Sequence, residues 1–178
     1  MQKQIQPLFL SMDYGLTYSP HIARGGGAPG MNHQNLPILW PTMAMALLIF
    51  VVWFVLLRQR LGHIASNRPT AETFANAENV ARYFRPVERP AQNLANLFEM
   101  PVLYFALVPL LIQAGQTSIT QVLLAWFFVG LRVAHSVVHI GPNAIQTRFR
   151  LYLASDIALS AMWLGFVIDL LIRAGASA

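Results

Sequence analysis

The sequence predicts an all-α integral membrane protein, folded as a four-helix up-and-down bundle. Two features of its composition predict this fold class. Hydrophobic residues make up 56% of the 178-residue chain and charged residues only 11%, less than half the roughly 25% that is typical of soluble domains. The apolar residues also lie in long blocks rather than at the spacing of one helix face, which is the pattern of chains that cross a bilayer.

Four of these blocks are long enough to cross a bilayer, which takes about 20 helical residues each. They cover residues 37–57, 91–114, 119–140 and 149–174. The link between the second and third blocks is short and uncharged, so neighbouring helices are expected to be antiparallel. We therefore expect a transmembrane domain over residues 37–178. Residues 1–36, with a triple-glycine run and scattered prolines, are expected to form a loop-rich extension before it.

The placement of arginines predicts the orientation in the membrane. Six arginines lie between the first and second spans, and the turn between the third and fourth spans carries Arg148 and Arg150. The opposite side has only Lys3, Arg24 and Arg173. Because basic residues concentrate in cytoplasmic loops, both arginine-bearing loops are expected in the cytoplasm and both termini in the periplasm of a bacterial inner membrane.

The net charge of +5 does not indicate nucleic-acid binding. The arginines of the first loop are mixed with Glu72, Glu78 and Glu88, and their excess is better explained by the bias of cytoplasmic loops toward basic residues. Apolar residues between Thr70 and Phe84 predict a short interfacial helix in this loop. The chain has no cysteine, so disulfides, thiolate metal sites and a protein thiol nucleophile are excluded. Thiol chemistry here would need the sulfur to arrive on a cosubstrate.

Polar and ionisable residues recur inside three of the predicted spans, where they are costly. They are Gln92, Asn93, Asn96 and Glu99 in the second span, Arg132, His135 and His139 in the third, and Arg148, Tyr152 and Asp156 in the fourth. Most are three or four residues apart and so share a helix face. At 1.5 Å per residue, Glu99, Arg132 and Asp156 lie at one level, roughly 10–15 Å from the cytoplasmic ends.

We expect this layer to place Arg132 against Glu99, Asp156 or both. A purely structural role, in which these groups only hold the helices together, explains the pattern equally well. His135 and His139 have the spacing of metal ligands, but two ligands do not make a site and Glu99 would have to supply a third. The sequence therefore predicts no metal.

The residues around this layer resemble the MAPEG family, the membrane-associated proteins of eicosanoid and glutathione metabolism. The segment from Val87 to Pro101 has the family's second-helix form, with arginine before an Asn-x-x-Glu pair (Asn96 and Glu99) and a proline soon after it. The stretch Leu131-Arg132-Val133-Ala134-His135 resembles the Arg-x-x-His of the third helix. The resemblance runs from about residue 38 to the C-terminus and is especially like the bacterial branch, whereas residues 1–36 have no counterpart.

The resemblance implies a homotrimer that binds glutathione between neighbouring subunits near the cytoplasmic face. Enzymes of this family act on lipophilic electrophiles or hydroperoxides. By position, the glutathione-binding residues are Arg58 (or Arg60), Arg89, Asn96, Glu99, Arg132 and His135. Arg148 falls where an arginine stabilises the thiolate, and Tyr152 where a tyrosine lines the same site. A nearby guanidinium lowers the pKa of a thiol and raises its thiolate fraction.

The sequence also departs from the family pattern. Gln92 stands where a second arginine is frequent, Ala95 where some members have a third, and His139 where a tyrosine is common. Two functions therefore stay open: a glutathione-dependent transferase or peroxidase, and a non-catalytic scaffold or accessory subunit that docks a partner protein through residues 1–36. A transporter is disfavoured because the sequence has no evident internal repeat or broken helix.

Overall fold

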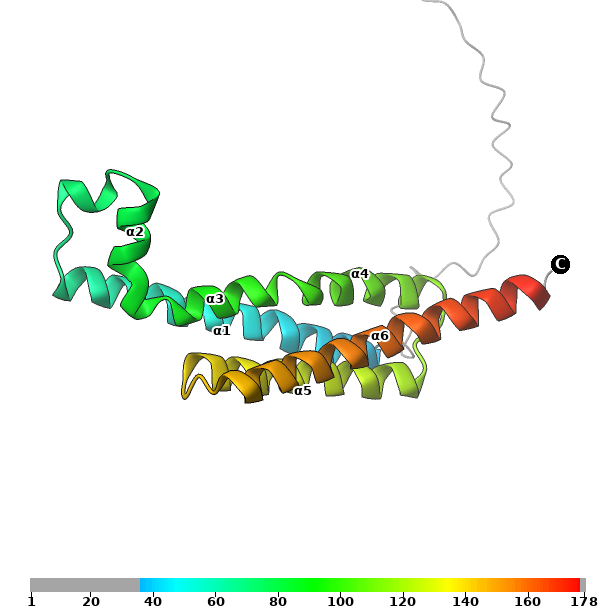
Figure 1. The fold of residues 1–178 in the computed structure, drawn as a ribbon. Coiled ribbons are helices and arrows are strands. Elements are labelled where there is room, and N and C mark those ends of the chain that lie inside the picture. The colour runs from blue at the N-terminus through cyan, green and yellow to red at the C-terminus, as the bar shows by residue number, and fades with distance from the viewer. Residues whose placement is uncertain (1–35, 177–178) are drawn as a thin grey trace, which may run out of the picture. The chain divides into compact units, whose positions relative to one another are not determined.

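The computed structural model describes residues 36–176, so the expectations for the extension over residues 1–36 lie outside it, except at Leu36. In the described part, four helical segments are long and apolar enough to cross a membrane, and no strand is present. The segments are Leu36–Ser66, Arg89–Gln113, Ile119–Ile140 and Ile145–Ala176 (Figure 1). The prediction of an all-helical membrane protein with four spans is confirmed.

The first and last helices are longer than the sequence predicted. Helix α1 covers Leu36–Ser66 and helix α6 covers Ile145–Ala176. At 1.5 Å per residue each is about 46–48 Å long, well beyond the roughly 30 Å hydrocarbon core of a bilayer. The extra turns contain polar residues such as Arg58, Arg60 and Arg148, and Pro69 follows the end of α1. The apolar blocks therefore marked the membrane-embedded parts of these helices rather than their ends.

The loop after α1 contains three short helices in succession. They are the 3-10 helix η2 (Ala71–Phe74), helix α2 (Ala77–Phe84) and the 3-10 helix η3 (Arg85–Val87). The Asn76 side chain caps α2 by accepting from the backbone N–H of Asn79 at 2.9 Å. The prediction of a short helix in this loop is confirmed.

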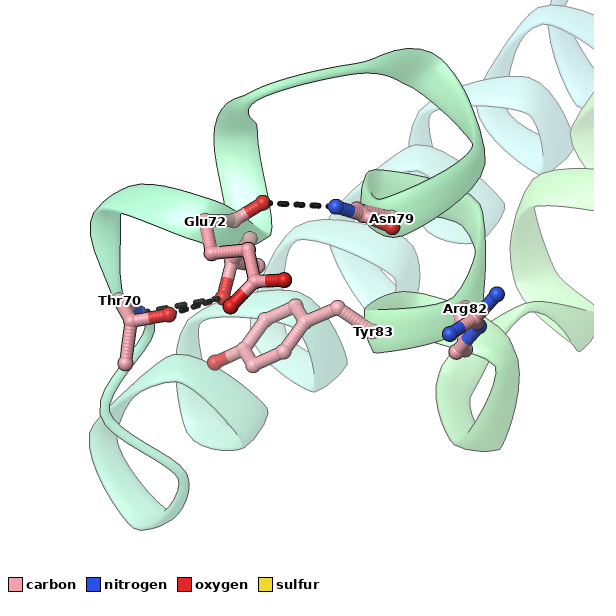
Figure 2. Close-up of a pocket in the computed structure, with 6 residues that line it drawn as sticks. Thr70, Glu72, Asn79, Arg82 and Tyr83 are labelled. Atoms are coloured by element: carbon pink, nitrogen blue, oxygen red, sulfur yellow. Dashed lines mark hydrogen bonds between the residues drawn. The ribbon is translucent and has the colours of Figure 1, made fainter.

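A hollow of about 280 Å³ lies between η2 and α2 (Figure 2). Its polar groups bond to one another: Asn79 Nδ2 donates to the Glu72 carbonyl at 2.9 Å, and the Thr70 and Thr73 hydroxyls are 3.3 Å apart. The Tyr83 hydroxyl donates to the Asn67 carbonyl and ties α2 to the end of α1. These bonds hold the loop together, and the hollow contains none of the predicted site residues.

The second span is interrupted, which corrects the expectation of one continuous helix. Helix α3 covers Arg89–Leu97 and helix α4 covers Met100–Gln113. Between them, Glu99 has φ −88° and ψ −100°, outside the helical region. Pro101 explains the break, because it lacks an N–H and its ring clashes with the carbonyl four residues earlier. The break turns Glu99 away from the regular path of α3.

The turn between α4 and helix α5 (Ile119–Ile140) is a Schellman motif. Gly115 has φ +63°, and its N–H donates to the Ile112 carbonyl at 3.2 Å. The N–H of Gln116 donates to the Leu111 carbonyl at 2.8 Å. The bounds of α5 coincide with those of the predicted third span. A positive φ favours glycine here because it has no Cβ to clash.

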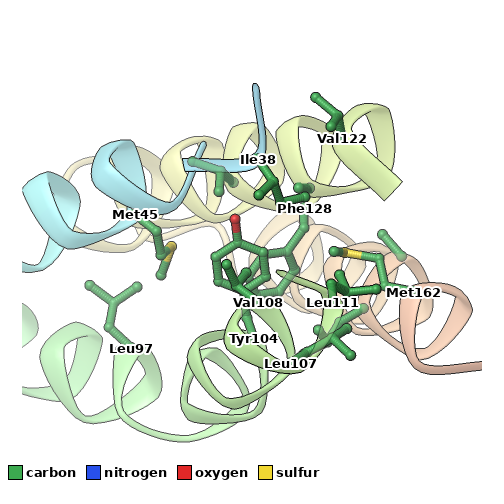
Figure 3. Close-up of a cluster of buried hydrophobic side chains, with 14 of the residues drawn as sticks. Ile38, Met45, Leu97, Tyr104, Leu107, Val108, Leu111, Val122, Phe128 and Met162 are labelled. Atoms are coloured by element: carbon green, nitrogen blue, oxygen red, sulfur yellow. The ribbon is translucent and has the colours of Figure 1, made fainter. Parts of the chain in front are cut away.

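The helices meet around one apolar core (Figure 3). Helix α1 contributes Ile38, Met45 and Val52, spaced seven residues apart as in left-handed helix bundles. Around Tyr104 the core is completed by buried residues of the other spans, including Leu97, Leu107, Leu111, Val122, Phe128, Leu159 and Met162. The hydroxyl of Tyr104 lies 3.0 Å from Thr42 Oγ1, which itself donates to the Ile38 carbonyl, so the buried phenol has a partner.

Many large apolar side chains point outward instead. On α1 these include Trp40, Phe50 and Phe54, each more than half exposed. In water such a surface would be unstable, but in a membrane it contacts lipid or another protein. The chain is therefore a multi-pass membrane protein.

Candidate functional site

Polar contacts join α5 to α6 along their length. Gln121 Nε2 donates to the Met162 carbonyl at 3.0 Å, while further along α5 His135 Nδ1 lies 3.0 Å from the Arg148 carbonyl. As the residue number rises along α5, the residue number of the contact on α6 falls, so the two helices are antiparallel. Arg132 lies between these contacts, in the half of the bundle that adjoins the arginine-bearing loops.

Arg132 is fully buried and forms an ion pair with Asp156. Its Nη2 lies 2.5 Å from Asp156 Oδ1, and the aspartate side chain is 18% exposed. Of the two partners expected for Arg132, the structure thus selects Asp156 rather than Glu99. The guanidinium carbon also lies 4.5 Å from the ring centre of Tyr152 and 5.4 Å from that of Phe128. These rings give the buried cation additional stabilisation through their electron-rich faces.

Glu99 bonds to Tyr152 instead of Arg132. The Tyr152 hydroxyl donates to Glu99 Oε2 at 3.0 Å, across the break in the second span. Because the regular helix ends before Glu99, Asn96 and Glu99 do not share one continuous helix face as the spacing suggested. They nevertheless line the same cleft. The phenol of Tyr152 thus lies between the carboxylate of Glu99 and the guanidinium of Arg132.

The two histidines of α5 lie next to one another, and His135 also lies next to Tyr152. The rings of His135 and His139 are 5.5 Å apart, edge to face, and the His135 ring is 5.8 Å from that of Tyr152. Asn96 Nδ2 lies 3.5 Å from His139 Nδ1. The Nε2 atoms of both histidines are buried without a hydrogen-bond partner. Among the described residues no group of three His, Asp or Glu side chains is placed to hold a metal ion.

Arg148 comes from the first turn of α6 and is held by the preceding turn. Its Nη1 donates to Asn143 Oδ1 at 2.5 Å, and its Nε is buried without a partner. Asn143 has φ +57°, a conformation that asparagine tolerates better than most residues. Arg89 Nη1 donates to the Gly141 carbonyl of the same turn at 2.9 Å. The two arginine-bearing loops therefore meet at one end of the bundle.

These side chains enclose an open cleft of about 410 Å³. Its lining residues are Asn96, Glu99, His135, Ile145, Arg148, Phe149 and Tyr152. The volume is within the roughly 300–1,000 Å³ of small-molecule sites. The cleft combines one carboxylate, one guanidinium, one phenol and an amide beside the apolar walls of Ile145 and Phe149. Such a site can hold a small zwitterionic ligand next to an apolar one.

Five of the eight residues expected at the site line this cleft, and Arg132 lies beneath it against the ring of Tyr152. Arg58 and Arg89 do not line it. Arg58 is exposed near the end of α1. Its alternative, Arg60, pairs with Glu88 at 3.7 Å. Arg58, Arg60 and Arg89 therefore all lie outside the cleft of their own chain.

Two residues of the site were missed or left without a role. Asn143 accepts a hydrogen bond from Arg148 and has a left-handed conformation. The sequence signal that could have pointed to it is the Gly-Pro-Asn turn in which it lies. Asp156 was recognised as a member of the polar layer, but its pairing was not decided. The choice between Asp156 and Glu99 required the position of the break in the second span.

Comparison with protein families decides what kind of chain this is. The model of the MAPEG family matches residues 38–168, about three quarters of the chain. The chain belongs to the MAPEG family. A comparison with curated proteins gave no match, and neither did a comparison with solved structures. As a MAPEG protein, the chain is a membrane protein of the family of glutathione and eicosanoid metabolism, and its cleft lies within the matched region.

Proposed function

We propose that this MAPEG protein is a glutathione-dependent transferase or peroxidase that acts on lipophilic electrophiles or hydroperoxides. The observation that carries the proposal is the cleft in which Asn96, Glu99, His135, Arg148 and Tyr152 converge. Glutathione, the cosubstrate, supplies the thiol that the cysteine-free chain lacks.

The cleft offers glutathione a carboxylate for its ammonium and buried polar atoms that still need hydrogen-bond partners. The tripeptide carries one ammonium, two carboxylates and a thiol. Glu99 Oε1 is available to accept from the ammonium, because the Tyr152 hydroxyl bonds to Oε2. Arg148 Nε and His135 Nε2 are buried polar atoms without partners, and such atoms are costly unless a ligand satisfies them.

Arg148 is the residue we assign to thiolate stabilisation. A guanidinium beside the sulfur favours the charged thiolate, the reactive nucleophile. The bond to Asn143 fixes the position of that guanidinium before the ligand arrives, so no ordering cost remains for the reaction. Tyr152 positions Glu99 and, with Phe149, forms the wall against which a lipophilic substrate would lie.

Binding and activity measurements test the proposal. Purified protein should bind glutathione in calorimetry and conjugate it to 1-chloro-2,4-dinitrobenzene. Arg148→Gln should lower the conjugation rate by about 10²-fold, the range expected when an electrostatic catalytic group is lost. Arg150→Gln is the matched control, because Arg150 is an exposed arginine of the same turn that does not line the cleft, and it should leave the rate unchanged. If wild-type protein neither binds nor conjugates glutathione, the enzyme proposal is wrong.

We also propose a homotrimer in a bacterial inner membrane, with the arginine-bearing loops in the cytoplasm and both termini in the periplasm. Two considerations support this arrangement. The arginines gather at the end of the bundle where Arg89 joins the two loops, which is the pattern of cytoplasmic loops. A single chain also offers the cleft too few cations for two carboxylates and a thiolate. A neighbouring chain can supply an exposed arginine such as Arg58.

A non-catalytic accessory subunit is the second candidate. The observation that favours it is the small number of cations at the cleft: among the described residues Arg148 is the one arginine that lines it, and the nearby Arg132 is neutralised by Asp156. The departures Gln92 and Ala95 are exposed uncharged residues of α3 and add no cation. Glutathione would then bind weakly or not at all. In that case a partner protein should co-purify from membranes, and deletion of residues 1–30 should release it. Unchanged co-purification of every partner after the deletion would refute docking through this segment.

A further inference from the structure

A second pocket lies at the opposite end of the bundle from the candidate site. It has a volume of about 440 Å³ and is formed where the turn between α4 and α5 meets the start of α1 and the C-terminal part of α6. Its walls include Gln116, Ile119, Asp169 and Arg173. Neither the family resemblance nor the proposed glutathione chemistry assigns it a ligand.

Gln116 is the unexplained residue of this pocket. Its side chain is only 3% exposed, and neither its Nε2 nor its Oε1 has a hydrogen-bond partner. In a Schellman motif this position usually makes an apolar contact with the last turn of the helix. A buried amide without partners is destabilising, whereas a leucine would fit the motif at no such cost. The amide therefore points to a ligand with both an acceptor and a donor.

The pocket also contains charged groups of both signs. Arg173, whose Nη1 donates to the Ala114 carbonyl at 2.9 Å, brings a cation to one wall. The start of α5 adds the N–H groups of Ile119 and Thr120, which have no acceptor within the helix, and the positive end of the helix dipole. Asp169 supplies a carboxylate one helical turn before Arg173. The pocket thus offers donors for an anion and acceptors for a cation.

We propose that this pocket binds the headgroup of a phospholipid that carries a primary ammonium. The phosphate accepts from Gln116 Nε2, Arg173 and the start of α5. The ammonium donates to Asp169 and Gln116 Oε1. A ligand that carried only a phosphate would leave Oε1 unpaired, and one that carried only an ammonium would leave Nε2 unpaired.

The position of the pocket identifies the source of the headgroup as lipid. The pocket lies where α1 begins, α4 ends and α5 begins, so it is at the ends of the spans and at headgroup level. Ile119, which lines the pocket and is 70% exposed, and Ile172 of α6, 65% exposed, give apolar surface for acyl chains. A soluble phosphorylated amine would gain nothing from this surface.

Native mass spectrometry of the full-length protein tests the proposal. The probes are dioleoyl phosphatidylethanolamine, dioleoyl phosphatidylcholine and dioleoyl phosphatidylglycerol, each added to delipidated protein. Wild type should retain the ethanolamine lipid at least tenfold more than either of the others. The choline headgroup cannot donate a hydrogen bond to Asp169, and the glycerol headgroup has no cation. Equal retention of the three lipids would overturn the proposal, because it would indicate only the general lipid layer.

Gln116→Leu and Asp169→Asn should change lipid retention in different ways. Gln116→Leu should lose the preference for the ethanolamine lipid at least tenfold, yet raise the unfolding temperature of the delipidated protein because an unpaired amide is removed. Asp169→Asn should lower the preference over the choline lipid, because it removes the counter-charge of the ammonium, while both lipids are still retained. The matched control is Gln113→Leu, an exposed glutamine at the same end that does not line the pocket, which should change neither readout.

Three further results would contradict the proposal. In the first, Gln116→Leu retains the ethanolamine lipid like wild type, so that the amide is not a ligand. In the second, the unfolding temperature of delipidated Gln116→Leu falls, so that the amide is satisfied without lipid. In the third, O-phosphoethanolamine without acyl chains displaces the lipid at millimolar concentration, so that the pocket is a site for a soluble amine phosphate.

Discussion

Removal of Asp156 should strongly destabilise the protein. Its carboxylate lies 2.5 Å from Nη2 of Arg132, whose side chain is fully buried. The substitution Asp156→Leu leaves this cation without a counter-charge at the level of the membrane interior. The rings of Tyr152 and Phe128 still face the guanidinium, but Arg132 Nε and Nη1 already have no hydrogen-bond partner.

The structure sets the scale of the effect. At 2.5 Å and an effective dielectric constant of about 20, the attraction between the two charges is about 7 kcal/mol. Desolvation of both groups offsets part of this attraction. The expected loss in unfolding free energy for Asp156→Leu is therefore about 3–5 kcal/mol, the range for a buried pair that loses one partner. Arg132→Met should cost less, because the aspartate left behind is 18% exposed, can take up a proton and keeps the Ser155 hydroxyl 3.5 Å from its Oδ1.

A double-mutant cycle separates the pair from its surroundings. Unfolding is followed by tryptophan fluorescence during titration with sodium dodecyl sulfate. The double variant Arg132→Met/Asp156→Leu should recover most of the loss, because replacing both charges of a buried pair is often neutral or stabilising. Glu78→Ala is the control: it breaks the exposed Arg82–Glu78 pair and should cost at most about 0.5 kcal/mol. A double variant no more stable than Asp156→Leu alone would refute the reasoning.

Three further predictions concern the core and the site. Leu107→Ala, at a fully buried position, should cost about 2–5 kcal/mol in the same titration, whereas Leu110→Ala, 38% exposed, should cost far less; equal losses would contradict the packing. Tyr104→Phe should cost about 0.5–1.5 kcal/mol, since it removes the bond to Thr42. Asn143→Gly keeps a residue suited to φ +57° but frees the Arg148 guanidinium, so glutathione conjugation should fall while the unfolding temperature changes little. An unchanged rate would show that Asn143 does not position Arg148.

The sequence grouped the residues of the candidate site better than it described their bonds. The spacing of polar residues in the second, third and fourth spans placed Asn96, His135 and Tyr152 near one another, and all three line the cleft. The spacing could not decide the partner of Arg132, because Glu99 and Asp156 lie at the same depth. That choice depends on the azimuth of each helix and on the break before Pro101, which turns Glu99 toward Tyr152.

The sequence by itself determined that the chain crosses a membrane four times and that polar residues concentrate near one end of the bundle. It did so because burial in lipid requires about 20 consecutive apolar residues per span, a constraint visible in any short window. Only the tertiary structure decided which polar groups bond to one another and which stay unpaired. The unpaired amide of Gln116 depends on contacts between residues far apart in the chain, and no local pattern in the sequence contains that information.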